Sequence, residues 1–111
     1  MSPRQMSLLQ GTLDVLVLQA LAHEARHGYG VAEWIHRASE GTLEIEDGAL
    51  YTSLHRMERR GLLQSEWGVS ESNRRAKYYS LTSRGRRELE ASAREWTRYA
   101  EAMAKVLAAG R

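Results

Sequence analysis

Five side chains in the middle of the sequence are of types that form hydrogen bonds with nucleic acid. They combine a phenol, two small hydroxyls, an imidazole and a guanidinium, at Tyr51, Thr52, Ser53, His55 and Arg56. Groups of these kinds reach base edges in the major groove of DNA and the oxygens of its phosphates. For Tyr51, the pattern alone is equally consistent with a partly buried core aromatic.

A second group of candidates follows further along the chain. It consists of Arg74, Arg75, Lys77 and Tyr79. Cationic side chains bind phosphates and contribute affinity rather than sequence information. For the two arginines, the alternative is a solvated turn. Tyr78 and Tyr79 are adjacent in a predicted strand, so one must face the core and the other solvent. Either orientation of Tyr79 is open.

The positive charge of the chain is concentrated where these candidates lie. The formal net charge is −4 over residues 1–47, +6 over residues 48–87 and zero over residues 88–111, which gives +2 in total. A basic segment confined to one part of the chain is typical of a nucleic-acid-binding face. A solvated basic patch would produce the same distribution.

Hydrophobic spacing predicts three helices before the second group of candidates. The first extends from about Leu8 to His23 and is apolar on more than one side, so we expect it to be buried. Arg26–Gly28 is interpreted as a turn, and the second helix extends from about Tyr29 to Ser39. The third extends from about Asp47 to Arg60 and ends at Gly61. Its apolar stripe is narrow, so the first group of candidates occupies its remaining sides.

Two strands and a long helix complete the predicted elements. The strands cover Leu62–Trp67 and Ala76–Leu81, and the loop between them, residues 68–75, is too long for a tight hairpin turn and should project as a wing. Thr82 is a good N-cap for a helix from about Ser83 to Ala108. This helix carries a heptad seam suited to pairing two chains, at Leu89, Ser92, Trp96, Tyr99, Met103 and Val106.

The order of these elements predicts the fold class. It is mostly α with a two-stranded β wing: a winged helix-turn-helix over residues 1–81 and a C-terminal dimerisation helix over residues 82–111, in one compact unit. The basic residues then lie on the third helix and in the wing. This arrangement predicts a protein that binds double-stranded DNA.

Four segments carry a resemblance to a known family. They are LLQGTLDVLVLQAL (Leu8–Leu21), HGYGVAEWI (His27–Ile35), GALYTSLHRMERRGLL (Gly48–Leu63) and WGVSESNRRAKYYSLTSRG (Trp67–Gly85). Together they resemble the PadR-like transcription regulators, in the short subfamily with one C-terminal helix, over nearly the whole chain. The LY dipeptide and the RRAKYYSLT strand are specific only in combination.

The resemblance implies a homodimer, formed through the N- and C-terminal helices, whose third helix enters the major groove of a pseudo-palindromic operator. It also implies transcriptional control, usually repression, that a small molecule relieves in some members. Tyr51 matches the family's recognition-helix tyrosine. The basic wing strand is matched by Arg74, Arg75, Lys77 and Tyr79. Many relatives have proline where this chain has Asp47, which with Glu46 places negative charge near the expected DNA surface.

Trp96 allows a second function hypothesis. It matches a tryptophan that, in some drug-responsive relatives, lines a pore at the dimer interface and stacks on planar ligands. A tryptophan on a heptad seam is otherwise dimer core, and Tyr99, one turn away, has the same two alternatives. The chain could therefore be a receptor for planar apolar or cationic small molecules, with or without DNA binding. A third hypothesis is a protein-interaction module that uses the seam alone.

Several other classes of protein are disfavoured. Cysteine is absent, which excludes disulfides and thiolate metal sites. His23 and His27 have helical spacing, but the expected turn and the lack of a completing ligand argue against a metal. No catalytic motif is found, so we expect neither an enzyme nor a cofactor. No segment is apolar enough to span a membrane and nothing near Met1 resembles a signal peptide, so a cytoplasmic location is expected.

Overall fold

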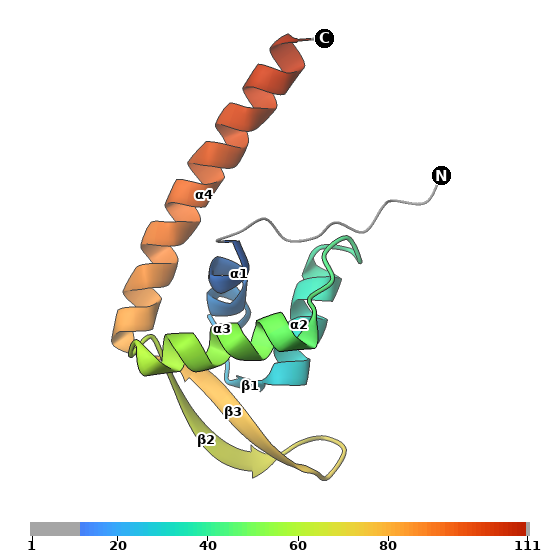
Figure 1. Cartoon of the computed structure of the whole chain (residues 1–111), viewed down its shortest axis with the longest axis vertical. Helices are drawn as coiled ribbons and strands as arrows, with labels where there is room; N and C mark the ends of the chain where they lie inside the picture. The colour runs from blue at the N-terminus through green and yellow to red at the C-terminus, as the bar shows by residue number, and fades with distance from the viewer. Residues whose placement is uncertain (1–11, 111) are drawn as a thin grey trace.

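The computed structural model describes residues 12–110, which form helices and one small antiparallel sheet (Figure 1). The helices are α1 (Thr12–Ala20), α2 (Gly28–Ala38), α3 (Asp47–Arg59) and α4 (Ser83–Ala109). The strands are β1 (Arg26–His27), β2 (Leu63–Val69) and β3 (Arg75–Leu81). The predicted class, a mostly helical winged fold, is confirmed, with one strand more than predicted.

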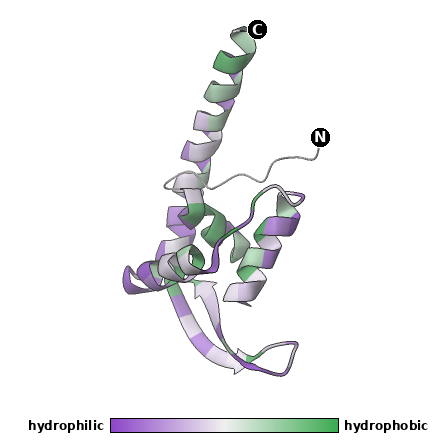
Figure 2. Ribbon diagram, turned by 45° about the vertical axis from the view of Figure 1, so that its right-hand side comes forward, coloured by the Kyte–Doolittle hydropathy of each residue, from purple (hydrophilic) through white to green (hydrophobic). Residues whose placement is uncertain are grey.

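The core lies between α1, α2, α3 and the base of the sheet. From α3, Leu50, Leu54 and Met57 face inward, and each is at most 1% exposed. The other large buried apolar residues are Val17, Leu18, Leu21, Val31, Ile35, Ile45, Leu62, Leu63, Tyr79, Leu81 and Leu89. Figure 2 shows hydrophobic residues gathered where the helices meet. Because the buried residues of α3 form a narrow stripe, to which Ser53 also belongs, the helix presents its other polar residues to solvent.

The sheet has the strand order β1–β3–β2. β1 pairs Arg26 with Tyr79 and His27 with Tyr78. The prediction of a turn at Arg26–Gly28 was therefore wrong. A strand of two residues is too short to show alternation, and its partner lies far along the chain. β1 joins the start of α2 directly to the inner strand of the wing.

The wing is a hairpin whose register runs from Leu63 opposite Leu81 to Val69 opposite Arg75. Both strands extend further toward the tip than predicted, so the loop covers residues 70–74 rather than 68–75. The Ser70 N–H donates to the Arg74 carbonyl at 2.8 Å, and Asn73 has φ 60°, a left-handed conformation that asparagine tolerates well. The tip is thus a short closed loop.

A single junction connects the end of α3 to the start of α4. Gly61 follows α3 with φ 78°, a conformation that favours glycine. Thr82 caps α4 as predicted, because its Oγ1 accepts the Gly85 N–H at 3.0 Å and donates to the Gly61 carbonyl at 2.7 Å. This hydroxyl therefore holds the two helix ends against each other.

The other helix boundaries differ little from those predicted. α1 ends at Ala20 rather than His23, and residues 8–11 of the predicted first helix lie outside the described residues. α4 contains 27 residues, of which Gly85 and Leu89 are buried. Its outer part projects away from the body (Figure 1). That part exposes the large apolar side chains of Trp96, Tyr99, Met103, Val106 and Leu107.

Candidate nucleic-acid interface

The outer face of α3 is polar and open to solvent. Thr52, His55 and Arg59 recur at helical spacing on the side opposite the buried stripe, and all are exposed. Tyr51 lies at the edge of this face, 43% exposed, with its ring centroid 6.2 Å from that of His55. Arg59 was not among the predicted site residues, although the same helical spacing identifies it.

α3 and the wing form two sides of one groove. A concavity of about 720 Å³ lies between them and the start of α2. Tyr51 and His55 line it from α3, whereas Arg74 and Arg75 line it from the wing. The structure therefore brings residues from both predicted groups, which are distant in sequence, to one surface.

The two arginines at the wing tip are free cations. Arg74 and Arg75 are exposed, and neither forms an ion pair within residues 12–110. The Arg75 guanidinium lies 4.5 Å from the centroid of the Trp67 ring, a cation–π contact that orients it without neutralising its charge. Both arginines thus remain available to an anionic partner.

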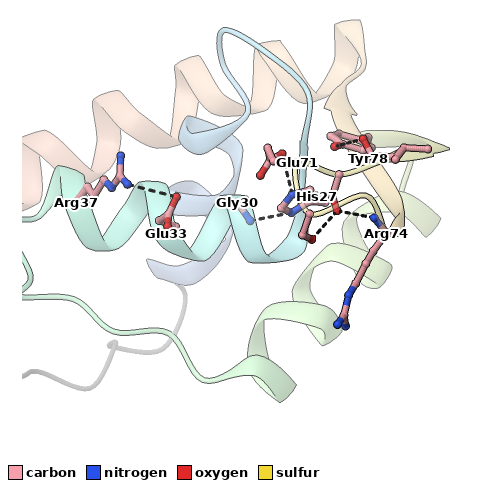
Figure 3. A network of polar contacts seen from close by, with 10 residues as sticks. His27, Gly30, Glu33, Arg37, Glu71, Arg74 and Tyr78 are labelled. Atoms are coloured by element: carbon pink, nitrogen blue, oxygen red, sulfur yellow. Dashed lines mark hydrogen bonds and ion pairs between the residues drawn. The ribbon is translucent and has the colours of Figure 1, made fainter.

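His27 ties the wing tip to the start of α2 (Figure 3). Its Nδ1 accepts the Gly30 N–H at 3.0 Å and so caps α2, while its Nε2 lies 3.4 Å from the Glu71 carboxylate in the tip. Its ring also meets Tyr78, with centroids 5.3 Å apart in an edge-on arrangement. Because Nδ1 is an acceptor, the neutral imidazole carries its proton on Nε2, which faces Glu71. These contacts fix the position of the tip relative to the helices.

Lys77 is half-buried and paired with a carboxylate of α3. Its Nζ lies 3.4 Å from Glu58 Oε1, and the Ser65 hydroxyl donates to Glu58 Oε2 at 2.5 Å. The hydrogen bond from Ser65 is the main cause that lowers the pKa of Glu58, partial desolvation opposes it, and the charge of Lys77 lowers the pKa further. Glu58 is therefore ionised at neutral pH and offsets the charge of Lys77 locally.

Tyr79 faces the core, which corrects the expectation that it contacts phosphate. Its side chain is 1% exposed, and burial is the main reason that the pKa of its phenol is raised. It shares a face of β3 with the buried Leu81. Tyr78 takes the other side of the strand, and its hydroxyl donates to the Val69 carbonyl at 3.1 Å.

Ser53 and Arg56 are held by α1. The Ser53 side chain is 1% exposed, and its hydroxyl donates to Asp14 Oδ1 at 2.6 Å. The guanidinium of Arg56 forms an ion pair with the same carboxylate oxygen. The structure therefore places Ser53 inside, which corrects the expectation of a DNA contact, and leaves Arg56 at the edge of the exposed face.

Gly28 provides the surface on which the Tyr51 ring lies. Gly28 is buried, and a Cβ built on it would be 2.6 Å from the Tyr51 hydroxyl oxygen and 2.7 Å from Cζ. Only a residue without a side chain allows this approach. The position of the Tyr51 side chain thus depends on the first residue of α2.

A separate cavity of about 590 Å³ lies between α1, the end of α3 and α4. Trp96 and Tyr99, the predicted ligand residues, line it together, with ring centroids 5.4 Å apart and planes inclined by 29°. Apart from Arg60, the charged residues of its lining are acidic: Asp14, Glu88 and Glu95. The structure thus brings two aromatic rings and an excess of negative charge to one cavity.

Two general features of residues 12–110 complete the description. Nowhere in this range do three or more histidine, cysteine, aspartate or glutamate side chains come together as metal ligands would. Over the same residues, no helix combines the length and apolarity needed to cross a membrane.

Comparisons with known proteins show which proteins this chain is similar to. The sequence matches the profile of the Transcriptional regulator PadR-like family over residues 17–91. A PadR family transcription regulator from hypervirulent Clostridium difficile is 31% identical, with a TM-score of 0.74 over 87% of this chain and 99% of that chain. A PadR family transcriptional regulator from Eggerthella lenta is 34% identical, with a TM-score of 0.70 over 88% of this chain and 83% of that chain.

A more distant structure has the same fold. Bacillus subtilis PadR, solved in complex with operator DNA, is 17% identical, with a TM-score of 0.66 over 78% of this chain and 48% of that chain. The family match covers more than half of the sequence, and the family consists of transcription regulators rather than enzymes. The chain therefore belongs to the PadR-like family of transcriptional regulators.

Proposed function

We propose that this chain binds double-stranded operator DNA as a homodimer and represses nearby genes. The observation that carries the proposal is the groove in which the exposed face of α3 and the free arginines of the wing meet. A major groove about 12 Å wide admits one helix, and the wing would then lie over the adjacent backbone or minor groove. Bacillus subtilis PadR, which shares the fold, was solved with operator DNA.

The exposed residues of this surface have different proposed roles. Side chains from α3 address base edges and phosphates, and those from the wing address phosphates: Tyr51, Thr52, His55, Arg59, Arg74 and Arg75. Arg56 and Lys77 contribute less, because each is paired with a carboxylate. Glu46 and Asp47 are exposed at the start of α3 and repel phosphate, so the middle of the helix should approach DNA most closely.

α4 supports the dimer part of the proposal. Its outer part exposes a row of large apolar side chains that includes Trp96, Met103 and Val106. A second copy would cover this row, with α1 packed beside it, and the two-fold axis of such a dimer matches a palindromic operator. In this arrangement residues 1–81 form the DNA-binding domain and residues 82–111 the dimerisation helix. With DNA as the partner, the proposed location is the cytoplasm.

The proposal is tested by selecting bound duplexes from a random pool at low salt, with the oligomeric state measured by sedimentation. We expect an inverted repeat whose half-sites are one helical turn, or a multiple of it, apart. Binding should weaken steeply as salt rises, because phosphate contacts release counterions. A stable dimer that enriches no duplex would contradict DNA binding, and a monomer that enriches single half-sites would contradict the dimer.

Gly28→Ala is expected to weaken operator binding while preserving the fold. The added methyl group would displace the end of the Tyr51 side chain, which can move into the groove, so the backbone need not shift. We expect a loss of about tenfold in affinity, the size of one lost hydrogen bond, in fluorescence-anisotropy titrations. Tyr51→Phe, which keeps the ring, is the comparison. Unchanged affinity for Gly28→Ala would remove the Tyr51 position from the interface.

The α1–α4 cavity favours a second function, the binding of planar cationic effectors. Its stacked Trp96 and Tyr99 rings offer an aromatic face, and its acidic lining attracts positive charge. An effector that prefers one spacing of the two recognition helices would shift the dimer toward it and release DNA. The two proposed functions are therefore compatible.

Trp96→Ala is expected to weaken binding of ethidium, a planar aromatic cation, by about tenfold, because stacking on an indole contributes about 1 kcal/mol or more. Calorimetry on the DNA-free protein measures this. Trp67→Ala removes an equally large ring outside the cavity and should leave ethidium binding unchanged. Equal affinities of wild type and Trp96→Ala would exclude Trp96 as the ligand platform.

A further inference from the structure

Asp14 of α1 forms hydrogen bonds with two side chains of α3. A single oxygen, Oδ1, accepts the hydroxyl of the buried Ser53 and the guanidinium of Arg56. Ser53 and Arg56 lie one turn apart on α3, so the carboxylate bridges successive turns of that helix. Asp14 is itself largely shielded, with 31% of its side chain exposed.

Arg56 is placed where a free cation would meet phosphate. With Thr52, one turn earlier on α3, it lines a concavity along the helix on the side away from the wing. The wing side is lined instead by Tyr51 and His55. A helix lying in the major groove has a phosphate backbone along each edge, so an extended Arg56 would reach the backbone opposite the wing.

The ion pair distinguishes Arg56 from the other arginines of the surface. Arg59, Arg74 and Arg75 form no ion pair within residues 12–110, whereas Arg56 shares its charge with Asp14. Phosphate contacts raise affinity for every sequence by a similar factor, so they contribute nonspecific affinity and no sequence information. Restraining one cation at the groove edge reduces that nonspecific contribution.

We propose that Asp14 is a positioning residue that limits the affinity of the chain for DNA of any sequence: it holds Arg56 back from the DNA backbone opposite the wing. This inference rests on the proposed DNA-binding function. It adds a role for a residue of α1, outside the helix proposed to enter the groove.

The test compares Asp14→Asn with wild type on the selected operator and on a scrambled duplex of the same length, across a salt series. Asparagine retains an oxygen that accepts from Ser53 but lacks the charge that restrains Arg56. We expect affinity for the scrambled duplex to rise about fivefold. The plot of log affinity against log salt should steepen by about 0.9, the value for one additional phosphate contact. Affinity for the operator should rise by a similar factor, so the ratio of operator to scrambled affinity should stay close to that of wild type.

Glu33→Gln is the matched control. It removes one negative charge from an acid–arginine pair on the surface of α2, where Glu33 lies 3.7 Å from Arg37, and so produces the same change in net charge. If Asp14→Asn changes the salt slope and the scrambled-duplex affinity no more than Glu33→Gln does, the proposal is wrong. If wild type binds neither duplex, the proposed function fails, and the inference fails with it for that separate reason.

Arg56→Gln provides an independent measurement that leaves Asp14 in place. With its charge already offset, Arg56 should contribute little to scrambled-duplex binding, so this variant should keep the wild-type salt slope. Arg59→Gln, which removes an unpaired cation from the same helix, should make the slope shallower by about 0.9. A slope for Arg56→Gln as shallow as that for Arg59→Gln would show that Arg56 already contacts phosphate, and would overturn the proposal.

Discussion

Replacing Gly85 with alanine is expected to destabilise the protein more than alanine at any other glycine within residues 12–110. A Cβ built on Gly85 would lie 2.0 Å from the Leu62 carbonyl oxygen and 3.0 Å from its carbon. That carbonyl belongs to the backbone between α3 and β2, and it also accepts the Thr82 N–H at 3.1 Å. A shift of this carbonyl away from the added methyl group would weaken its hydrogen bonds with Thr82.

The expected loss is about 3 kcal/mol or more in the free energy of unfolding, at the upper end for overpacking a buried site. Thermal unfolding followed by circular dichroism should show a Tm lower by about 10 °C or more. Gly48→Ala is the control, because a Cβ there meets only the flexible Glu46 carboxylate, at 3.5 Å. A Tm for Gly85→Ala within about 2 °C of wild type would contradict the packing at this junction.

The double substitution Arg74→Ala/Arg75→Ala should give the largest loss of DNA affinity. Both arginines are exposed, unpaired and on the wing side of the groove, so we expect each to neutralise one phosphate. Affinity should fall about 10- to 100-fold at moderate salt, by the same factor for operator and scrambled duplexes, and the salt slope should become shallower by about 1.8.

Arg37→Ala is the control for this loss. Arg37 lies on α2 and pairs with Glu33, away from the groove, so its removal should have a small effect on duplex binding. Because Arg75 also stacks on Trp67, the unfolding temperature of the double variant should be measured in parallel. A folded double variant with wild-type affinity would favour the hypothesis of a protein-interaction module that does not use the wing.

Local patterns in the sequence were sufficient for the elements that form the interface. The apolar stripe at Leu50, Leu54 and Met57 predicted which side of α3 is buried. Thr82 predicted the start of α4, and the long segment between the two strands predicted a wing. Each of these features is set by residues within a few positions of one another, and helical or strand periodicity reports such relations directly.

Contacts between distant segments could not be predicted in this way. Asp14 is separated from Ser53 and Arg56 by 39 and 42 positions, and no spacing rule links them. β1 exists only through its pairing with β3. Tyr79 is a different case, because it alternates with the apolar Leu81 along β3. That alternation indicated an inward ring, and matching the residue by position to a basic wing strand obscured it.

α4 has a mechanical consequence in the proposed dimer. β1 pairs with β3, and His27 lies beside Glu71 in the wing tip, so we expect each DNA-binding half to move as one body. A helix of 27 residues is about 40 Å long, so a tilt of about 5° at its base displaces its far end by about 3.5 Å. Because α4 is this long, a small change in packing near Leu89 would change the distance between the two DNA-binding halves of the dimer. The range of half-site spacings that the dimer accepts should then depend on how rigidly α4 is packed at Leu89.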